Sequence, residues 1–330
     1  MPKPNNLAAL RESLETYYGL MHSEMLRDED FYYRRYRKLF SAGSDVATYD
    51  IPIYEGSTAA NIVNSYRFQI NTESPTVVFR PPGSSRKSLD SASEMQLWGY
   101  AMLRKERENS SVDPYAQNAF DGLLRGAACK KITVDVENIP VRPASKKGQA
   151  WRDYQAALSS YWPFVSRAID PISVFPAPSR TTPLPYVLEV QKRTVLDVMV
   201  DYPAFSDPEG RKARASGDFV TANNPARAVT WLEYWSVPVY RDGEVVEEGH
   251  YIVEIDGDRV IDKENPCGFV PYVFEYSGYG RIDQQADPST LGVGILRDIR
   301  GDLGEEIRLM TAASASTLMN IFPTLLTTED

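Results

Sequence analysis

The chain has 330 residues, of which 42% are hydrophobic and 25% are charged, and its formal net charge is −9. These proportions are typical of a globular protein of about two domains with a substantial core, and the acidic balance argues against a nucleic-acid binder that works through a basic surface. No apolar run reaches the ~20 residues of a membrane span, and the N-terminus lacks the apolar region of a signal peptide. We therefore expect a protein that is made and folds in the cytosol and has no membrane partner.

Residues 1–40 predict an N-terminal helical segment. Apolar side chains recur at the steps of an amphipathic helix, at Leu7, Leu10, Leu14, Tyr17 or Tyr18, Met21 and Met25. Residues 28–40 begin with acids and end with bases, which favours a second helix because the helix dipole prefers that order. The bases of this second segment alternate with tyrosines, which is more typical of an amphipathic helix face than of the alternative, a nucleic-acid patch (Arg34, Arg35, Arg37 and Lys38).

The region 41–227 predicts a mixture of helices and strands. The expected helices have amphipathic spacing and cover residues 59–70, 91–108, 113–126 and 194–202, the last with Thr194 as its N-cap. The expected strands are short and apolar and cover residues 75–80, 131–136 and 186–191. Residues 138–148 and 206–224 are rich in turn-forming residues and predict loops, and residues 149–169 are expected to be partly helical.

Residues 228–290 predict a β-meander followed by a loop. Asp242-Gly243 and Asp256-Gly257 are typical of type I′ hairpin turns, so strands are expected at 228–241, 244–247, 251–255 and 259–262. Five apolar residues of the first strand share one face, which predicts a strand with one buried side (Val229, Trp231, Trp235, Val237 and Val239). The stretch from Ala228 to Cys267 holds ten acids and three bases, a charge of −7, which we interpret as a solvated acidic face.

Residues 291–330 predict one long helix, from Leu291 to about Phe322, roughly 45 Å in length. Its expected buried stripe steps by three or four residues (Leu296, Ile299, Leu303, Ile307, Met310 and Ser314). Charged residues gather on the opposite face (Arg297, Asp298, Asp302, Glu305 and Arg308). The segment from Thr311 to Thr317 holds only small residues, so another backbone can approach closely there. Four glycines weaken its first part, which predicts a kink or a later start (Gly292, Gly294, Gly301 and Gly304).

The sequence contains little that predicts catalysis. It has neither a phosphate-binding P-loop nor a GxSxG elbow, and the Gly292/Gly294 pair lacks the preceding strand and the third glycine of a dinucleotide turn. His22 and His250 stand alone without metal-ligand spacing. Cys129 and Cys267 lack CxxC spacing, which favours reduced, buried thiols over a disulfide. We therefore predict no catalytic residue, no cofactor and no metal site.

Several stretches, taken in order, are similar to the portal proteins of tailed bacteriophages. STAANIVNSYRFQI, SASEMQLWGYAMLRKE and DPYAQNAFDGLLRGAACKKITVDVE resemble the helices and strand of the portal wing. DPISVFPAP and PYVLEVQKRTVLDVMVDYP resemble the strand-to-helix step that follows them. VTWLEYWSV, GFVPYVFEYSGYG and LGVGILRDIRGDLGEEIRLM resemble the meander, the Pro-Tyr loop and the Gly-rich turn that leads into the stem helix. The resemblance spans residues 59–322 and rests on the joint order of these stretches.

The resemblance implies an α+β fold with a helical and small-sheet wing, a meander and a stem-like helix. It implies a homo-oligomeric ring, expected to be a dodecamer, at one capsid vertex. Double-stranded DNA would pass through this ring without sequence-specific binding during packaging and ejection. The packaging motor (terminase), capsid and scaffold proteins and neck or adaptor proteins would dock on it. The expected location is the virion, and the host cytoplasm during assembly.

The long helix then supplies the expected channel-facing or inter-subunit residues (Arg297, Asp298, Asp302, Glu305, Arg308, Thr311 and Ser314). Portal proteins usually continue through clip, tunnel and crown parts, and the chain ends where these would begin, so the resemblance implies either a truncated portal sequence or later parts that lie in another chain. Two alternatives stay open: a head-completion or structural adaptor protein that forms no ring, and a hydrolase with an unrecognised carboxylate site.

Overall fold

The computed structural model describes residues 3–37, 53–70, 77–110, 112–134, 139–179, 184–203, 205, 207–216, 224–241, 244–280 and 287–321. Its α-helices are α1 (Leu7–Tyr32), α3 (Thr58–Gln69), α4 (Arg86–Glu108), α5 (Pro114–Leu124), α6 (Gln149–Ser160), α7 (Val195–Asp201), α8 (Pro208–Ala215) and α10 (Arg300–Ile321). Its strands are β1 (Ala127–Val134), β2 (Phe164–Ile169), β3 (Val174–Pro176), β4 (Tyr186–Thr194), β5 (Ala228–Ser236), β6 (Val239–Arg241), β7 (Glu244–Glu247), β8 (His250–Ile255), β9 (Asp258–Glu264) and β10 (Tyr272–Tyr276). Short 3-10 turns are η2 (Pro171–Ser173), η3 (Pro288–Thr290) and η4 (Arg297–Ile299).

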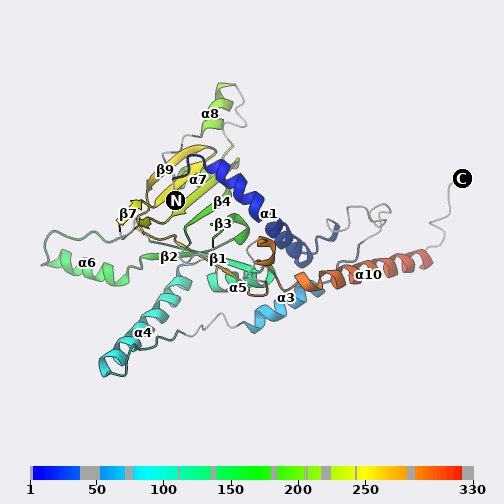
Figure 1. The fold of residues 1–330 in the computed structure, drawn as a ribbon, viewed down its shortest axis with the longest axis horizontal. Coiled ribbons are helices and arrows are strands. Elements are labelled where there is room, and N and C mark those ends of the chain that lie inside the picture. Colours follow the sequence, from blue (N-terminus) through cyan, green and yellow to red (C-terminus); the bar gives the residue numbers. More distant parts are fainter. Residues whose placement is uncertain are drawn as a thin grey trace.

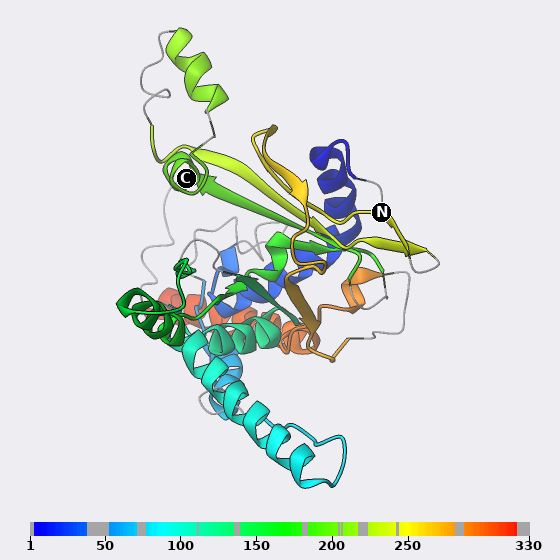
Figure 2. The same cartoon turned by 90° about the vertical axis from the view of Figure 1, so that its left-hand side faces the viewer.

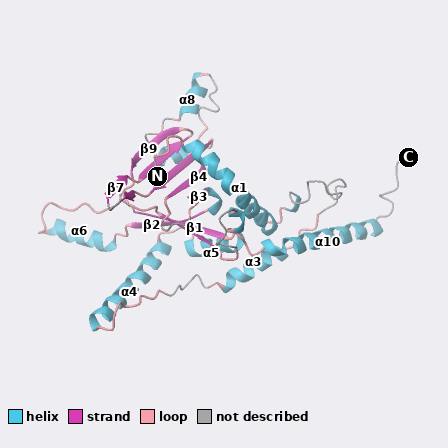
Figure 3. Ribbon diagram, in the orientation of Figure 1, coloured by secondary structure: helices cyan, strands magenta, loops and turns pink. Residues whose placement is uncertain are grey.

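The strands form small antiparallel sheets at the centre of the molecule, with the helices around them (Figure 3). Sheet A has the strand order β10-β1-β2, sheet B has the order β3-β4-β5-β8-β9, and β6 pairs with β7 alone. All the pairs in these sheets are antiparallel. This mixture of helices and separate antiparallel sheets is an α+β fold, as the sequence predicts.

Helix α1 covers one face of sheet B. Its residues Tyr18 and Met21 belong to a buried cluster with Leu188 of β4 and Tyr234 of β5. The Tyr18 hydroxyl also donates a hydrogen bond of 3.1 Å to the carbonyl oxygen of Pro176 at the end of β3. The helix is therefore fixed to the sheet by apolar contact and by a buried polar bond.

The opposite face of sheet B is covered by sheet A and by α7. Cys129 of β1 and Tyr272 of β10 pack with Trp235 of β5, and Val198 of α7 packs with Trp231. Strand β5 is consequently buried on both faces, and the prediction of a single buried side is wrong. The apolar odd-numbered residues suggested one buried face, but Leu232 and Tyr234 on the other face pack in the same cluster as α1.

The two predicted hairpins have different outcomes. Asp256 and Gly257 have φ values of 48° and 82°, so both adopt the left-handed conformation of a type I′ turn, and β8 pairs with β9 as expected. Asp242 and Gly243 lie outside the described residues, although the strands on either side of them, β6 and β7, do pair. The predicted strand 228–241 is divided near Pro238, which has no backbone N–H to donate to a sheet.

Several other predictions of elements need correction. Helix α1 continues through Asp28 to Tyr32, so a separate second helix does not begin at residue 28; the helix ends where Arg34 adopts a left-handed φ of 58°. The described part of the predicted strand 75–80 has no strand pairing. The segment 149–169 is partly helical as predicted, through α6, but its last residues form the unpredicted strand β2, and β10 and α8 lie within predicted loops. Strands β2 and β10 pair with β1, which is distant from them in sequence, and the unpredicted strand β3 pairs with β4.

Four helices extend from the central sheets in different directions, which gives the molecule an open outline (Figures 1 and 2). Helix α4 points away on one side, α6 and α8 on two others, and α10 extends away from the sheets at the end of the described chain (Figure 1). Many of the large apolar side chains on these helices are exposed. Compact domains usually cover such side chains, so these helices are candidates for contact with other chains.

Candidate functional site

The start of α10 is built into the body of the protein by a tight glycine turn. Gly126 has a φ of +74°, and a Cβ there would lie 2.2 Å from the backbone of Val293. A Cβ on Gly294 would lie 2.0 Å from the carbonyl oxygen of Leu124. The N–H of Ile295 donates a 2.9 Å hydrogen bond to the carbonyl oxygen of Leu123. The turn thus packs backbone to backbone against the corner between α5 and β1.

Two arginines after this turn bind two acids of α1. The guanidinium of Arg297 lies 3.1 Å from Asp28 and 3.6 Å from Glu24, and that of Arg300 lies 3.3 Å from Asp28 and also binds Glu24. Asp28 is completely buried, and both arginine side chains are mostly buried. We name these four residues the α1–α10 clamp. It fixes the direction in which α10 leaves the body.

The two acids of the clamp differ in their protonation. Burial raises the pKa of Asp28 to about 6 in spite of the charges of Arg297 and Arg300. Burial also acts to raise the pKa of Glu24, but the hydrogen bond and charge of Arg300, together with Arg297, outweigh it and lower that pKa below its usual value. The clamp therefore holds one strongly ionised carboxylate and one that titrates near neutral pH.

The predicted charged face of α10 is divided by the structure. Arg297 turns inward to the clamp, whereas Asp298 and Asp302 are exposed. Glu305 and Arg308 are also exposed and form an ion pair of 2.7 Å along the helix. The acids of this face are therefore available to solvent, but Arg297 has a role within the chain.

The predicted buried stripe holds only in the first half of α10. Leu296, Leu303 and Ile307 are buried in a cluster with residues of α1, α3 and α5. Thr311 is also buried, and its hydroxyl accepts a 3.0 Å hydrogen bond from the N–H of Tyr54. Ser314 is exposed and donates a 2.8 Å bond to its own helix, at the carbonyl oxygen of Met310.

Two corrections to the long helix follow. Met310 and Ser314 are exposed and do not continue the buried stripe. The regular helix begins at Arg300, after the 3-10 turn η4, and not at Leu291. This later start agrees with the prediction made from the glycines. Phe322 lies outside the described residues. Beyond Thr311 the described side chains of α10 have at most partial cover from the described chain. The inter-subunit candidates Thr311 and Ser314 thus lie in different surroundings.

A second polar cluster, which the sequence analysis did not predict, lies between the two sheets. The ammonium group of Lys131 on β1 lies 2.6 Å from Glu233 and 3.1 Å from Glu189, which face each other across β5 and β4. The Tyr272 hydroxyl donates to Glu189, and it lies 3.3 Å from Glu233. Burial raises the pKa of Tyr272 well above its usual value, so its proton stays in place. The only signal in the sequence was Glu233 within an apolar strand.

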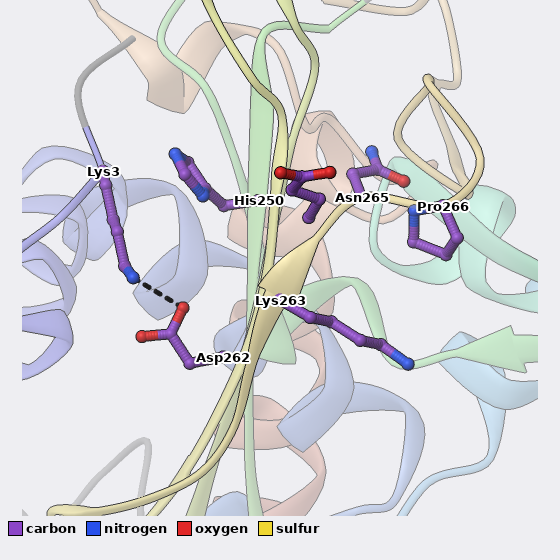
Figure 4. Close-up of a pocket in the computed structure, with 7 residues that line it drawn as sticks. Lys3, His250, Asp262, Lys263, Asn265 and Pro266 are labelled. Atoms are coloured by element: carbon purple, nitrogen blue, oxygen red, sulfur yellow. Dashed lines mark ion pairs between the residues drawn. The ribbon is translucent and has the colours of Figure 1, made fainter.

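One pocket, beside β9, is open and polar. A cavity of about 720 Å³ lies beside β9 and is lined by Lys3, His250, Asp262, Lys263 and neighbouring residues (Figure 4). Lys3 forms a 2.7 Å ion pair with Asp262 there, and its hydrogen bond lowers the pKa of that carboxylate. The Lys263 side chain is directed away from the Lys3–Asp262 pair, and its ammonium group lies 5.2 Å from the centre of the Tyr251 ring, so the lining charges do not converge on one point (Figure 4).

The cysteines and histidines of the described chain are separate from one another. Cys129 and Cys267 are both free, and Cys129 is buried, where burial raises its pKa. His22 packs against Phe175 with ring centroids 5.1 Å apart, and its buried position lowers its pKa to about 4. Within the described residues, no group of three His, Cys, Asp or Glu side chains is placed to hold a metal ion.

No protein-family model matches this chain, and no curated protein matches its sequence. No helix among the described residues combines the length and the apolar character that a bilayer crossing needs.

Proposed function

We propose that this chain is a portal-type subunit, which assembles with copies of itself into a ring at a phage capsid vertex through which double-stranded DNA passes. The observation that carries this proposal is α10. Its first turns are fixed by the clamp and the glycine turn, and the rest of the helix extends away from the body (Figure 1). A helix of 22 residues is roughly 33 Å long, so it can line a passage or pack beside identical helices.

The exposed side chains of α10 support contact with other helices. Leu309 is 69% exposed and Leu318 is 46% exposed, on a helix that also has an exposed charged face. Side chains of this size lose favourable burial when they face water. The two leucines lie on opposite sides of the helix, so two neighbouring copies of α10, one on each side, would cover them. The order of the sequence segments, which resembles that of portal proteins, supports the same assembly.

The charge of the chain supports passage of DNA over binding of DNA. The net charge is −9, Asp298 is exposed in η4, and Asp302 and Glu305 are exposed on α10. Carboxylates that face a passage repel the phosphates of DNA, so the duplex does not adhere to the wall. In this proposal the chain makes or breaks no covalent bond. It orients α10 along the passage, and other surfaces of the chain bind a packaging motor, capsid and scaffold proteins and neck proteins.

The decisive measurement is the mass of the purified chain in solution by light scattering, followed by negative-stain electron microscopy. We expect closed rings with a central opening, in the virion-derived and the recombinant protein alike. A Leu309→Glu/Leu318→Glu double variant should assemble at least tenfold more weakly, and Lys212→Glu on the exposed helix α8 is the matched control. A wild-type protein that stays monomeric at high concentration would refute the ring and favour an adaptor that forms none.

A further inference from the structure

Residues 139–163 form a basic arm that projects from the central sheets. It consists of α6 and the loops on either side of this helix, and we name it the α6 arm. The arm holds four bases and one acid, a net charge of +3, in a chain whose net charge is −9 (Arg142, Lys146, Lys147, Arg152 and Asp153). All four bases are exposed, and none of them has an ion-pair partner among the described residues. Within the described chain, the excess positive charge of the arm is therefore not compensated.

The α6 arm also has an apolar side. Trp151, Tyr154 and Leu158 are spaced by three and four residues and so share one face of α6. The rings of Trp151 and Tyr154 lie 5.3 Å apart, Leu158 is 47% exposed, and Val141 in the preceding loop is 90% exposed. None of the described side chains of α6 is buried, and a helix of 12 residues without tertiary contacts is marginally stable in water. The arm therefore needs an acidic surface with apolar side chains to pack against.

The hairpin of β6 and β7 is such a surface. Residues 239–249, which we name the β6–β7 hairpin, hold four acids and one base, a net charge of −3 (Arg241, Asp242, Glu244, Glu247 and Glu248). Tyr240 and Val245 pair across the two strands and so lie on the same face, where they are 65% and 44% exposed. Val246 is 57% exposed. The hairpin thus combines negative charge with exposed apolar side chains.

The β6–β7 hairpin has little support from its own chain. Within the described residues its two strands pair only with each other, and none of the described side chains of β6 and β7 is buried. A two-stranded hairpin is marginally stable by itself in water. Glu244 and Glu248 are exposed and have no ion-pair partner in the part of the chain that the structure describes. The hairpin therefore needs a basic partner that also covers its apolar side chains.

Other charged surfaces of the described chain fit these needs less well. At the outer end of α4, Arg86 and Lys87 balance Asp90 and Glu94, so the local charge is zero. On β9, two bases of the strand and Lys3 balance its three acids. Helix α8 is basic, but its sequence holds no large apolar side chain. Charge and apolar character together therefore match the α6 arm to the β6–β7 hairpin.

We propose that the α6 arm of one subunit packs against the β6–β7 hairpin of the neighbouring subunit, with bases against acids and one apolar face against the other. The arm and the hairpin lie on opposite sides of the central sheets (Figure 2), so they do not meet within one chain. The apolar face of α6 from Trp151 to Leu158 spans about 10 Å, and so does β7 from Glu244 to Glu247. Each subunit then gives its arm to one neighbour and its hairpin to the other. Such a head-to-tail contact closes a ring when the rotation between subunits allows it.

This inference rests on the proposed self-assembly and is tested by reversing charges in the full chain. The arm variant is Lys146→Glu/Lys147→Glu/Arg152→Glu, and the hairpin variant is Glu244→Lys/Glu248→Lys. Each variant places like charges across the contact and should assemble at least about tenfold more weakly than wild type in light scattering. The combined variant, which carries both sets of changes, restores opposite charges across the contact and should assemble within about threefold of wild type.

The controls separate this contact from the ring itself. All the substituted residues are exposed, and circular dichroism should show an unchanged fold in every variant. Lys212→Glu changes a base on another projecting helix, α8, and should have no effect. Arm and hairpin variants that form rings as wild type does, or a combined variant that assembles no better than either, would overturn the contact and leave the proposed ring standing. Filaments or open oligomers that each reversal abolishes would support the contact and refute the ring, and a monomeric wild type would overturn both.

Discussion

Asp28 and Glu24 lie one turn apart on α1 and face the same two arginines, yet their pKa values move in opposite directions. Asp28 is completely buried, so the loss of water around its charge is larger than the attraction of Arg297 and Arg300. Glu24 keeps contact with solvent, so the arginines dominate. Within one ion-pair group, the burial of each carboxylate therefore decides whether its pKa is raised or lowered.

The first prediction concerns the pH dependence of the clamp. The folded protein holds the proton of Asp28 more tightly than the unfolded chain does, since the pKa rises from 3.8 to about 6. Wild-type stability should therefore increase relative to Asp28→Asn as the pH falls from 7.5 to 4, by on the order of 3 kcal/mol. Urea unfolding of both proteins across this range measures the difference.

Glu24→Gln is the matched control for this prediction, and its sign is opposite. The pKa of Glu24 is lowered in the folded state, so the ionised form contributes stability that is lost as the pH falls. Wild type should therefore lose its advantage over Glu24→Gln at low pH. If the stability difference from wild type changed with pH in the same way for both variants, the assignment of Asp28 as the buried carboxylate and Glu24 as the solvated one would be contradicted.

The second prediction concerns Lys131, whose ammonium group separates two carboxylates between the sheets. Lys131→Met leaves Glu189 and Glu233 buried and opposed, and should lower the free energy of unfolding by about 3–5 kcal/mol. The triple variant that adds Glu189→Gln and Glu233→Gln removes both charges and should recover a large part of this loss. Denaturant unfolding at pH 7.5 measures both effects. A triple variant no more stable than Lys131→Met would show that the repulsion of the carboxylates is not the cause.

Among the elements, α10 depends on the turn that precedes it. Glycines in this part of the sequence weaken a helix, but Gly294 has a different role, because backbone atoms occupy the space of its missing side chain. Gly294 lies against the carbonyl group of Leu124, whereas Gly301 lies on the open side of α10, where nothing is within 4 Å of a Cβ. Glycine therefore permits a close backbone contact at position 294, whereas at position 301 it only lowers the stability of the helix.

The third prediction compares these two glycines. Gly294→Ala should destabilise the protein by at least about 2 kcal/mol, because the neighbouring atom is backbone and cannot turn aside. Gly301→Ala should stabilise it by up to about 1 kcal/mol through helix propensity. Thermal unfolding of the two variants measures both. Equal effects would show that the turn does not pack against the α5–β1 corner.

The elements that could be predicted from the sequence are those with local signals. The amphipathic spacing of α3, α4 and α5, the Thr194 cap of α7 and the Asp256-Gly257 turn all appear in the structure. Strands β2 and β10 could not be predicted, since they are short and gain their stability from β1, which is distant in the sequence. The clamp could not be predicted either, because α1 and α10 lie at opposite ends of the chain.

At the scale of the whole molecule, the sheets join parts of the chain that the sequence pattern suggested were separate. Sheet B takes β3 and β4 from the region before residue 227 and β5, β8 and β9 from the meander after it. Helices α4, α6 and α8 leave this centre (Figures 1 and 2), and most of their described side chains are exposed or half-buried. The molecule thus combines a well-packed centre with projecting helices that depend on other surfaces.

The fourth prediction concerns those projecting helices. In dilute monomer the backbone amides of α6 and of residues 312–321 should exchange with deuterium much faster than those of β5 and β8, because few contacts hold these helices closed. In the assembled form both helices should become protected by at least tenfold, while β5 and β8 should change little. Hydrogen exchange followed by mass spectrometry at two protein concentrations measures this. Equal exchange in both states would place the contacts between subunits elsewhere.

The pairing of β1 with β10 has a consequence for how the protein is made. Residues Ala127–Lys131 pair with Tyr272–Tyr276, so sheet A closes a long loop of chain. Contacts between residues so distant in sequence slow folding, and during synthesis they form only after the later partner has left the ribosome. We therefore expect the nascent chain to keep one edge of β1 unpaired until β10 emerges. Interrupted synthesis before that point should yield a chain that chaperones retain.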